Sequence, residues 1–185
     1  MMAEAQQTTN PVRLYMLALD IKEALDAAYR ARPKDVEVLL DLVRFHAVTP
    51  RIAGGDRNLA TTFATDLTKL DEPLGHFAAG YLAYRDKQFG VARHELKEAV
   101  RTTTGAHHTL ALQWLGWLSQ ESQQWTDAFD AWEQLRGIDP KATYEIGRTA
   151  VFCGCERERG KAALTEYVKS APKDDAAKDL LKKLQ

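Results

Sequence analysis

Two cysteines, Cys153 and Cys155, flank a single glycine in the stretch FCGCE. A metal site would need three or four ligands, and no nearby pair of histidines completes one. A disulfide across a single residue would be strained. The pattern therefore predicts two plain thiols, either structural or partly exposed, with redox or metal chemistry as the alternative.

The stretch TPRIAGGDRNLA, residues 49–60, is a second candidate for chemistry because a proline and a paired glycine interrupt it. A nucleotide-binding loop would follow a strand and end in Gly-Lys-Ser/Thr, and neither feature is present. We predict a corner between two helices. Pro50 ends the first helix, Gly54 and Gly55 adopt backbone angles that other residues avoid, and Asp56 caps the second helix. An anion-binding nest at that helix N-terminus is the alternative.

The histidines show no spacing typical of a metal site. His107 and His108 are adjacent, so on a helix they point to different faces and do not share a metal as residues four apart can. His46 is expected to face the packing between helices. No Ser-His-Asp or Cys-His arrangement stands out. The sequence therefore predicts no catalytic residue, no metal site and no cofactor.

The bulk properties exclude two classes of partner. A formal net charge of -1 over 185 residues gives no electrostatic case for binding nucleic acid. No run of 18 apolar residues is present, so no membrane span is expected. The N-terminal stretch MMAEAQQTTNPVR is polar and does not resemble a signal peptide. As the sequence stands we expect a cytoplasmic protein, or an exported one if a signal peptide was removed.

Apolar residues recur at spacings of three and four along most of the chain, which is the helical period. In residues 13–31, for example, Leu14, Leu17, Ile21 and Leu25 share one face, and Pro33 ends the helix. No alternating strand pattern competes with this period. The predicted fold class is all-α.

Two stretches, residues 80–100 and 116–136, are copies of each other. Six matched pairs lie 36 residues apart: Gly80 and Gly116, Leu82 and Leu118, Gln88 and Gln124, Phe89 and Trp125, Ala92 and Ala128, and Leu96 and Trp132. The copies predict a helix, a tight turn and a second helix, in which the small residues let the two backbones pack closely. Leu96 and Trp132 are expected to pack on the neighbouring unit. Because one hairpin cannot bury its own apolar face, several must stack.

These residues resemble the tetratricopeptide repeat (TPR), a helical pair of about 34 residues. The clearest copy is 109–142, with Leu115-Gly116, Trp125, Ala128, Trp132 and Asp139-Pro140, and 73–106 is the next. Degenerate copies cover 36–72 and 141–172, and 11–35 is half a repeat. The 36–72 unit, its GGD loop and the segment YEIGRTA resemble a bacterial group of TPR proteins with no enzymatic assignment.

The resemblance implies an architecture for the whole chain. A flexible segment, 1–10, precedes a single TPR-like domain over 11–185 that ends in a cap helix over 174–184. The expected fold is an α-solenoid, a right-handed superhelix of stacked antiparallel hairpins with about ten helices.

The resemblance also implies a function. In TPR arrays the first helices of the units line a concave groove that takes an extended peptide or a partner helix. Repeat phase assigns eight residues to this groove: Arg44, Phe77, Tyr81, Tyr84, Gln113, Trp117, Gln120 and Arg148. Cations and aromatic rings suit an acidic or aromatic-bearing segment. If they bind a partner, Arg44, Tyr81, Trp117 and Arg148 should be partly exposed, whereas the two aromatics are buried if they only fill the core.

The resulting hypothesis is a non-catalytic scaffold for protein–protein interaction, with a protein or peptide partner and possible homo-oligomerisation. The alternative is an accessory or sensor domain that holds a small apolar ligand in a cavity between hairpins. A closed apolar pocket would favour the ligand. An open groove with exposed arginines would favour the peptide.

Overall fold

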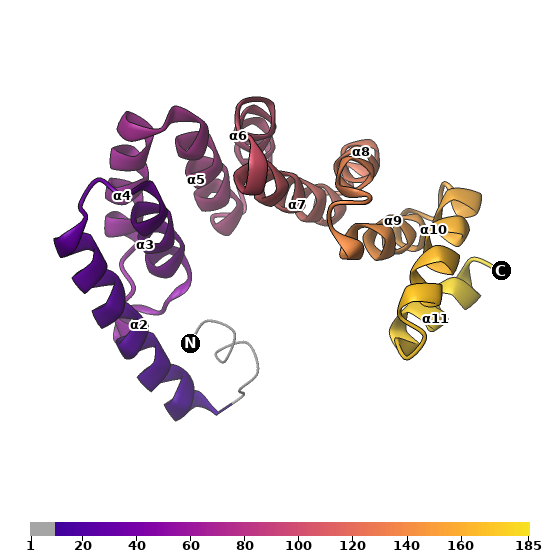
Figure 1. The fold of residues 1–185 in the computed structure, drawn as a ribbon, viewed down its shortest axis with the longest axis horizontal. Helices are drawn as coiled ribbons and strands as arrows, with labels where there is room; N and C mark the ends of the chain where they lie inside the picture. Colours follow the sequence, from indigo (N-terminus) through magenta and orange to yellow (C-terminus); the bar gives the residue numbers. More distant parts are fainter. Residues whose placement is uncertain (1–9) are drawn as a thin grey trace. The chain divides into compact units, whose positions relative to one another are not determined.

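The computed structural model describes residues 10–185, and 82% of these described residues are helical. The described residues form ten α-helices and one short 3-10 helix, with no strand among them (Figure 1). The predicted all-α class with about ten helices is confirmed. The predicted flexible segment 1–10 lies outside the described residues except for Asn10, which caps the first described helix.

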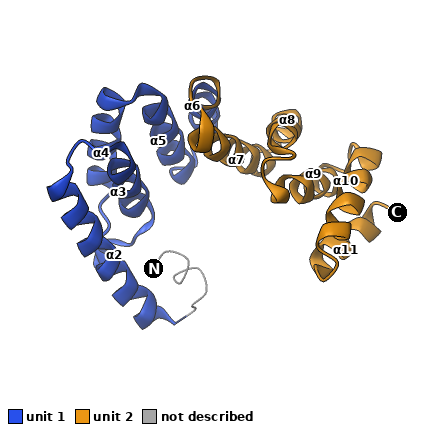
Figure 2. Cartoon of the chain, in the orientation of Figure 1, with its two compact units in different colours: residues 1–99 blue, residues 100–185 orange. Residues whose placement is uncertain are grey.

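The chain divides into two compact units, residues 1–99 and residues 100–185 (Figure 2). Unit 1 holds α2 (Pro11–Ala31), α3 (Val36–Val48), the 3-10 helix η1 (Arg51–Ala53), α4 (Arg57–Leu70), α5 (Glu72–Arg85) and most of α6 (Phe89–Thr102). Unit 2 holds α7 (Gly105–Glu121), α8 (Trp125–Leu135), α9 (Pro140–Cys153), α10 (Arg157–Ser170) and α11 (Asp175–Lys183).

Helices that follow one another in the sequence pack together within each unit. In unit 1, α3 packs on α4 and α5, and α2 packs on α3 and η1. In unit 2, α7 packs on α8, α8 on α9, and α9 on α10, while α11 contacts both α9 and α10. Aspartates begin several of these helices, because their side chains accept backbone N–H groups that the first turn leaves unpaired. The capping aspartates are Asp35, Asp56, Asp71, Asp139 and Asp174.

A glycine marks the close approach of the two helices in each of three hairpins. A Cβ added to Gly80 would lie 2.8 Å from Leu96, and one added to Gly116 would lie 2.5 Å from the Trp132 ring. A Cβ added to Gly147 would likewise lie 2.2 Å from Leu164. The predicted role of the small residues is confirmed for these glycines. Leu96 and Trp132 cover the glycine of their own hairpin, however, whereas the sequence predicted that they pack on the neighbouring unit.

The turns of the two copies have the same backbone conformation. Lys87 and Gln123, which are 36 residues apart, both have a φ of 58°. The residue after each closes the turn with the same hydrogen bond, from Gln88 N to Ala83 O at 2.9 Å and from Gln124 N to Ser119 O at 2.7 Å. The sequence repeat is therefore a repeat of local structure.

The loop after α3 is a corner between helices, as predicted. Gly54 has a φ of 88°, and the side chain of Asp56 accepts a hydrogen bond from Asn58 N at 2.8 Å at the start of α4. The reason for the second glycine was predicted wrongly, since Gly55 does not have a positive φ. A Cβ at Gly55 would lie 1.8 Å from the carbonyl oxygen of Thr49. This position therefore needs glycine because a larger residue would clash with the backbone.

His46 lies in the core between α3 and α4, as predicted, with an exposed fraction of 3%. Its ring stacks on Phe63 with the ring centroids 5.7 Å apart. Its Nδ1 atom has no hydrogen-bond partner within the described part of the chain. Burial lowers the pKa of His46 below its ordinary value, and the positive charge of Lys22 lowers it further. The ring therefore favours its neutral form.

Candidate functional site

An apolar groove of about 640 Å³ lies within unit 1, between α2, α3, η1 and α5. Leu14 and Tyr15 line it from α2, Phe45 and Val48 from α3, and Ile52 from η1. Four of these side chains are open to solvent, with exposed fractions of 83% for Ile52, 47% for Val48, 41% for Tyr15 and 37% for Leu14. Exposed apolar residues gathered in this way are unusual on a protein surface, where they typically mark a binding site.

Two of the eight predicted residues, Arg44 and Tyr81, line this same groove. Among the described lining residues, Arg44 alone is charged. Its NH1 atom lies 3.6 Å from Asp41, and both side chains are part exposed. Burial raises the pKa of Asp41, and Arg44 acts in the opposite direction. Arg44 is thus a half-exposed cation beside an apolar surface.

The predicted aromatic residues of α5 lie deeper than expected. Tyr81 is 4% exposed, so its expected partial exposure was wrong, and burial raises the pKa of its hydroxyl. Phe77 is fully buried and its ring stacks on Tyr81, with centroids 6.5 Å apart. Tyr84 is half-buried, with its ring 6.2 Å from Phe89 at the hairpin corner. Tyr81 is therefore a buried lining residue of the groove, and the ring of Phe77 packs against it.

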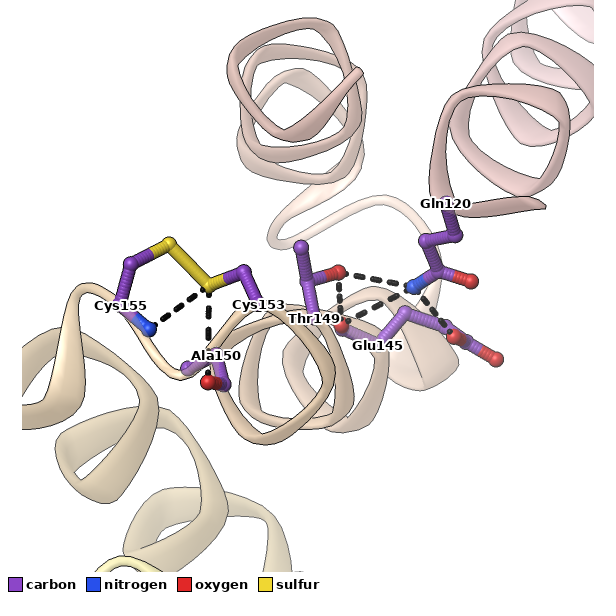
Figure 3. The surroundings of a disulfide bond; sticks show 6 residues. All are labelled: Gln120, Glu145, Thr149, Ala150, Cys153 and Cys155. Atoms are coloured by element: carbon purple, nitrogen blue, oxygen red, sulfur yellow. Dashed lines mark hydrogen bonds between the residues drawn. A yellow bond between two sulfur atoms is a disulfide. The ribbon is translucent and has the colours of Figure 1, made fainter. Parts of the chain in front are cut away.

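Gln120, the predicted residue at the end of α7, belongs to a buried polar network in unit 2 (Figure 3). Its Nε2 atom donates to Glu145 Oε2 at 3.0 Å and to Thr149 Oγ1 at 2.8 Å. Arg148 donates to both carboxylate oxygens of Glu145, at 3.0 and 3.1 Å. Its guanidinium also lies over the ring of Phe152, 5.1 Å from the centroid. The network joins α7 to α9. Because the amide nitrogen of Gln120 is used in these hydrogen bonds, Gln120 positions the two helices.

The other two predicted residues of unit 2 lie earlier on α7. Gln113 donates to Asp139 at 2.8 Å, next to the start of α9. Trp117 is 37% exposed and packs edge-on against Trp132, with centroids 5.8 Å apart. Of the four residues expected to be partly exposed, Arg44, Trp117 and Arg148 are, and Tyr81 is not.

Two groups of site residues were not predicted from the sequence. Tyr15, Val48 and Ile52 in the unit 1 groove are apolar residues at exposed positions, and Ile52 in a polar loop was the signal that could have found them. Glu145 and Thr149 complete the network around Gln120, and polar residues four apart on α9 were the signal for that pair.

The prediction of two free thiols was wrong, because Cys153 and Cys155 form a disulfide (Figure 3). Gly154 between them has a φ of 64°, a left-handed conformation that turns the chain back at the end of α9. This turn brings the two side chains together, which an ordinary extended residue would not allow.

The described part of the chain shows neither a metal-ligating cluster nor a membrane-spanning helix. It contains no group of three or more His, Cys, Asp or Glu side chains placed to hold a metal ion. None of its described helices is long and apolar enough to cross a membrane. Comparison with known proteins found no matching family and no matching curated protein.

Proposed function

We propose that this protein is a non-catalytic, TPR-like scaffold and that the groove of unit 1 binds an amphipathic helix of a partner protein. The observation that carries the proposal is the open apolar surface of Leu14, Tyr15, Val48 and Ile52 beside the cation of Arg44. An amphipathic helix laid in an apolar groove is a common mode of peptide recognition, with anchors at helical spacing.

The repeated hairpin supports the TPR-like part of the proposal. Gly80 beneath Leu96 and Gly116 beneath Trp132 are equivalent close approaches 36 residues apart. The matching turns at Lys87 and Gln123 add an equivalence of backbone conformation. A chain built from repeated hairpins exposes the first helices of successive hairpins, and repeat proteins use such surfaces for binding.

The groove's charge indicates an acidic partner. Arg44 is its charged lining residue, and the lining side chains around it are almost all apolar. A glutamate or aspartate at the edge of the partner's apolar face would pair with Arg44 in a partly desolvated setting, where charge pairs are stronger than in water.

The alternative, a small apolar ligand, is favoured by one observation. A volume of about 640 Å³ falls within the usual range for ligand pockets. Such pockets bury most of their ligand, however, and the groove leaves Ile52 at 83% exposure and Val48 at 47%. A partner helix that covers these side chains fits the open surface better.

The test uses two designed helical peptides that share one apolar face, with leucines at helical spacing. The polar face of one carries glutamates and that of the other carries lysines. Fluorescence anisotropy measures binding of each labelled peptide to the full chain. The acidic peptide should bind more tightly, and Arg44→Ala should remove the difference between the two peptides.

A pair of matched substitutions locates the binding surface. Ile52→Asp should weaken binding of the acidic peptide by roughly tenfold or more, since burying one large apolar side chain contributes about 1.5–3 kcal/mol. Ile138→Asp is the control, because Ile138 is also an exposed isoleucine, at 63%, but lies in unit 2. Equal losses from the two substitutions, or tighter binding of the lysine peptide, would contradict the proposal. Binding of a long-chain fatty acid by a chain that binds neither peptide would support the alternative.

A further inference from the structure

The Cys153–Cys155 disulfide joins residues that the fold already holds side by side. α9 and α10 pack against each other in this hairpin, with Leu164 covering Gly147. A bridge that closes only three residues removes little freedom from the unfolded chain, because this effect grows with loop length. The hairpin therefore does not depend on the bridge for its packing.

The bridge is also accessible. Cys153 and Cys155 are both part exposed, and Gly154 between them lies at the surface. A Cβ added at Gly154 would meet nothing within 4 Å, so the space beside the bridge is open. Exposed disulfides are the ones that exchange readily with thiols, whereas structural ones resist.

The two sulfur atoms have different surroundings (Figure 3). The backbone N–H of Cys155 donates to Cys153 Sγ at 3.0 Å. If a thiolate attacks Cys155 Sγ, the sulfur of Cys153 leaves with the negative charge, and this N–H stabilises it. Once protonated, the Cys153 thiol lies 3.5 Å from the carbonyl oxygen of Ala150, to which it can donate. Cys153 is therefore suited to leave and Cys155 to be attacked.

A pocket of about 230 Å³ opens at Gly154, the residue between the two cysteines. It is lined by Gly154 and by two cations, Arg157 at the start of α10 and Lys183 at the end of α11. The remaining described lining residues are apolar, so the charge of the pocket is positive. Two cations in a pocket that Gly154 also lines favour a thiol that carries carboxylate groups.

We propose that Cys153 and Cys155 form a reversible thiol–disulfide exchange site whose co-reactant is a small thiol bearing carboxylates. The first thiolate, RS⁻, attacks Cys155 Sγ, which forms the mixed disulfide R–S–S–Cys155 and releases Cys153 as a thiolate. A second RS⁻ attacks the R sulfur of the mixed disulfide, which yields RSSR and frees Cys155. Two protons from water convert the two cysteine thiolates into thiols. The bridge gains two electrons, and the two thiols lose them.

The experiment reduces the full-length native protein with an anionic thiol, thioglycolate, and with a neutral one, 2-mercaptoethanol. Alkylation followed by mass spectrometry counts the cysteines released over time, and circular dichroism follows the helices. Both thiols should release two cysteines while the helical signal stays unchanged. Reoxidation by the corresponding small-molecule disulfide should restore the bridge.

Charge substitutions test the pocket. The double variant Arg157→Ala/Lys183→Ala should slow reduction by thioglycolate about three- to sevenfold, the range expected for two partly screened charges, and leave the rate with 2-mercaptoethanol unchanged. The control Lys161→Ala/Lys169→Ala removes the same charge from another surface of α10. Reduction only after the helices unfold would overturn the exchange site. An equal slowing in the control, or none in the pocket variant, would overturn the preference for an anionic thiol.

Discussion

Gly116→Ala tests the packing on which the repeat depends. The added Cβ would lie 2.5 Å from two carbon atoms of the Trp132 ring, whereas carbon atoms pack best about 3.5–4.0 Å apart. Trp132 is 1% exposed and cannot move aside, so α7 and α8 must separate. Overpacking costs about 1–3 kcal/mol, and the better helix propensity of alanine returns roughly 0.5–1 kcal/mol. We expect a net loss of about 1–2 kcal/mol, or roughly 2–8 °C in melting temperature for a chain of this size.

The assay is urea unfolding followed by tryptophan fluorescence and by circular dichroism. All four tryptophans of the chain, at positions 114, 117, 125 and 132, lie in unit 2, so fluorescence reports on the unit that holds the substitution. Gly90→Ala is the control, because Gly90 lies in α6 with nothing within 4 Å of its Cβ position. Since Gly90 lies in unit 1, this variant is compared with Gly116→Ala by circular dichroism. It should be neutral or slightly stabilising. A Gly116→Ala protein as stable as the Gly90→Ala protein would refute the close approach of α7 and α8.

Three further predictions concern stability. Ala128→Leu, at a fully buried site, should cost about 1–3 kcal/mol or more in urea unfolding, whereas the exposed neighbour change Asp130→Leu should cost much less. Gly55→Ala should lower the melting temperature by more than Gly90→Ala changes it, because its Cβ would overlap a backbone carbonyl oxygen at 1.8 Å. The lowered pKa of His46 means that the unfolded chain takes up a proton first as the pH falls. The contribution of neutral His46 to the free energy of unfolding should therefore be fully present above about pH 6.5 and decline below it, by at most about 1.4 kcal/mol per pH unit. His46→Phe should flatten this decline in urea titrations between pH 7.5 and 5.

Local patterns made most of the fold predictable. Helical periodicity located the helices because apolar spacing reports directly on which face is buried. The 36-residue repeat located the hairpins, since a glycine opposite a bulky residue is typical of a site where two helices approach closely. Gly80 and Gly116 illustrate this, and both lie where the sequence placed them.

The features that the sequence did not predict depend on contacts far apart in the chain or on single backbone angles. The unit 1 groove needs Tyr15 from α2 and Ile52 from η1 to lie together, and neither residue stands out by itself. Tyr81 has the same place in its repeat as Trp117, yet it is buried and Trp117 is not, because burial depends on neighbouring helices. The disulfide at Cys153 depends on the left-handed turn at Gly154.

The division of the eight predicted residues between the two units bears on the proposed function. Arg44 and Tyr81 lie at an open apolar groove, whereas Gln120 and Arg148 already make hydrogen bonds within unit 2. Among the described residues, a partner at the first site would compete only with the 3.6 Å contact between Arg44 and Asp41. At the second it would compete with Glu145, which is buried and accepts hydrogen bonds from both residues. The proposal therefore assigns the binding surface to unit 1.

The most direct measurement of this assignment is NMR mapping of the full chain, labelled on isoleucine, leucine and valine methyl groups, titrated with the acidic helical peptide. We expect saturable shifts at Leu14, Val48 and Ile52 of unit 1, while the methyl group signals of Leu118 and Ile138 in unit 2 stay unchanged. Shifts confined to unit 2, with the methyl groups of the groove unaffected, would contradict it.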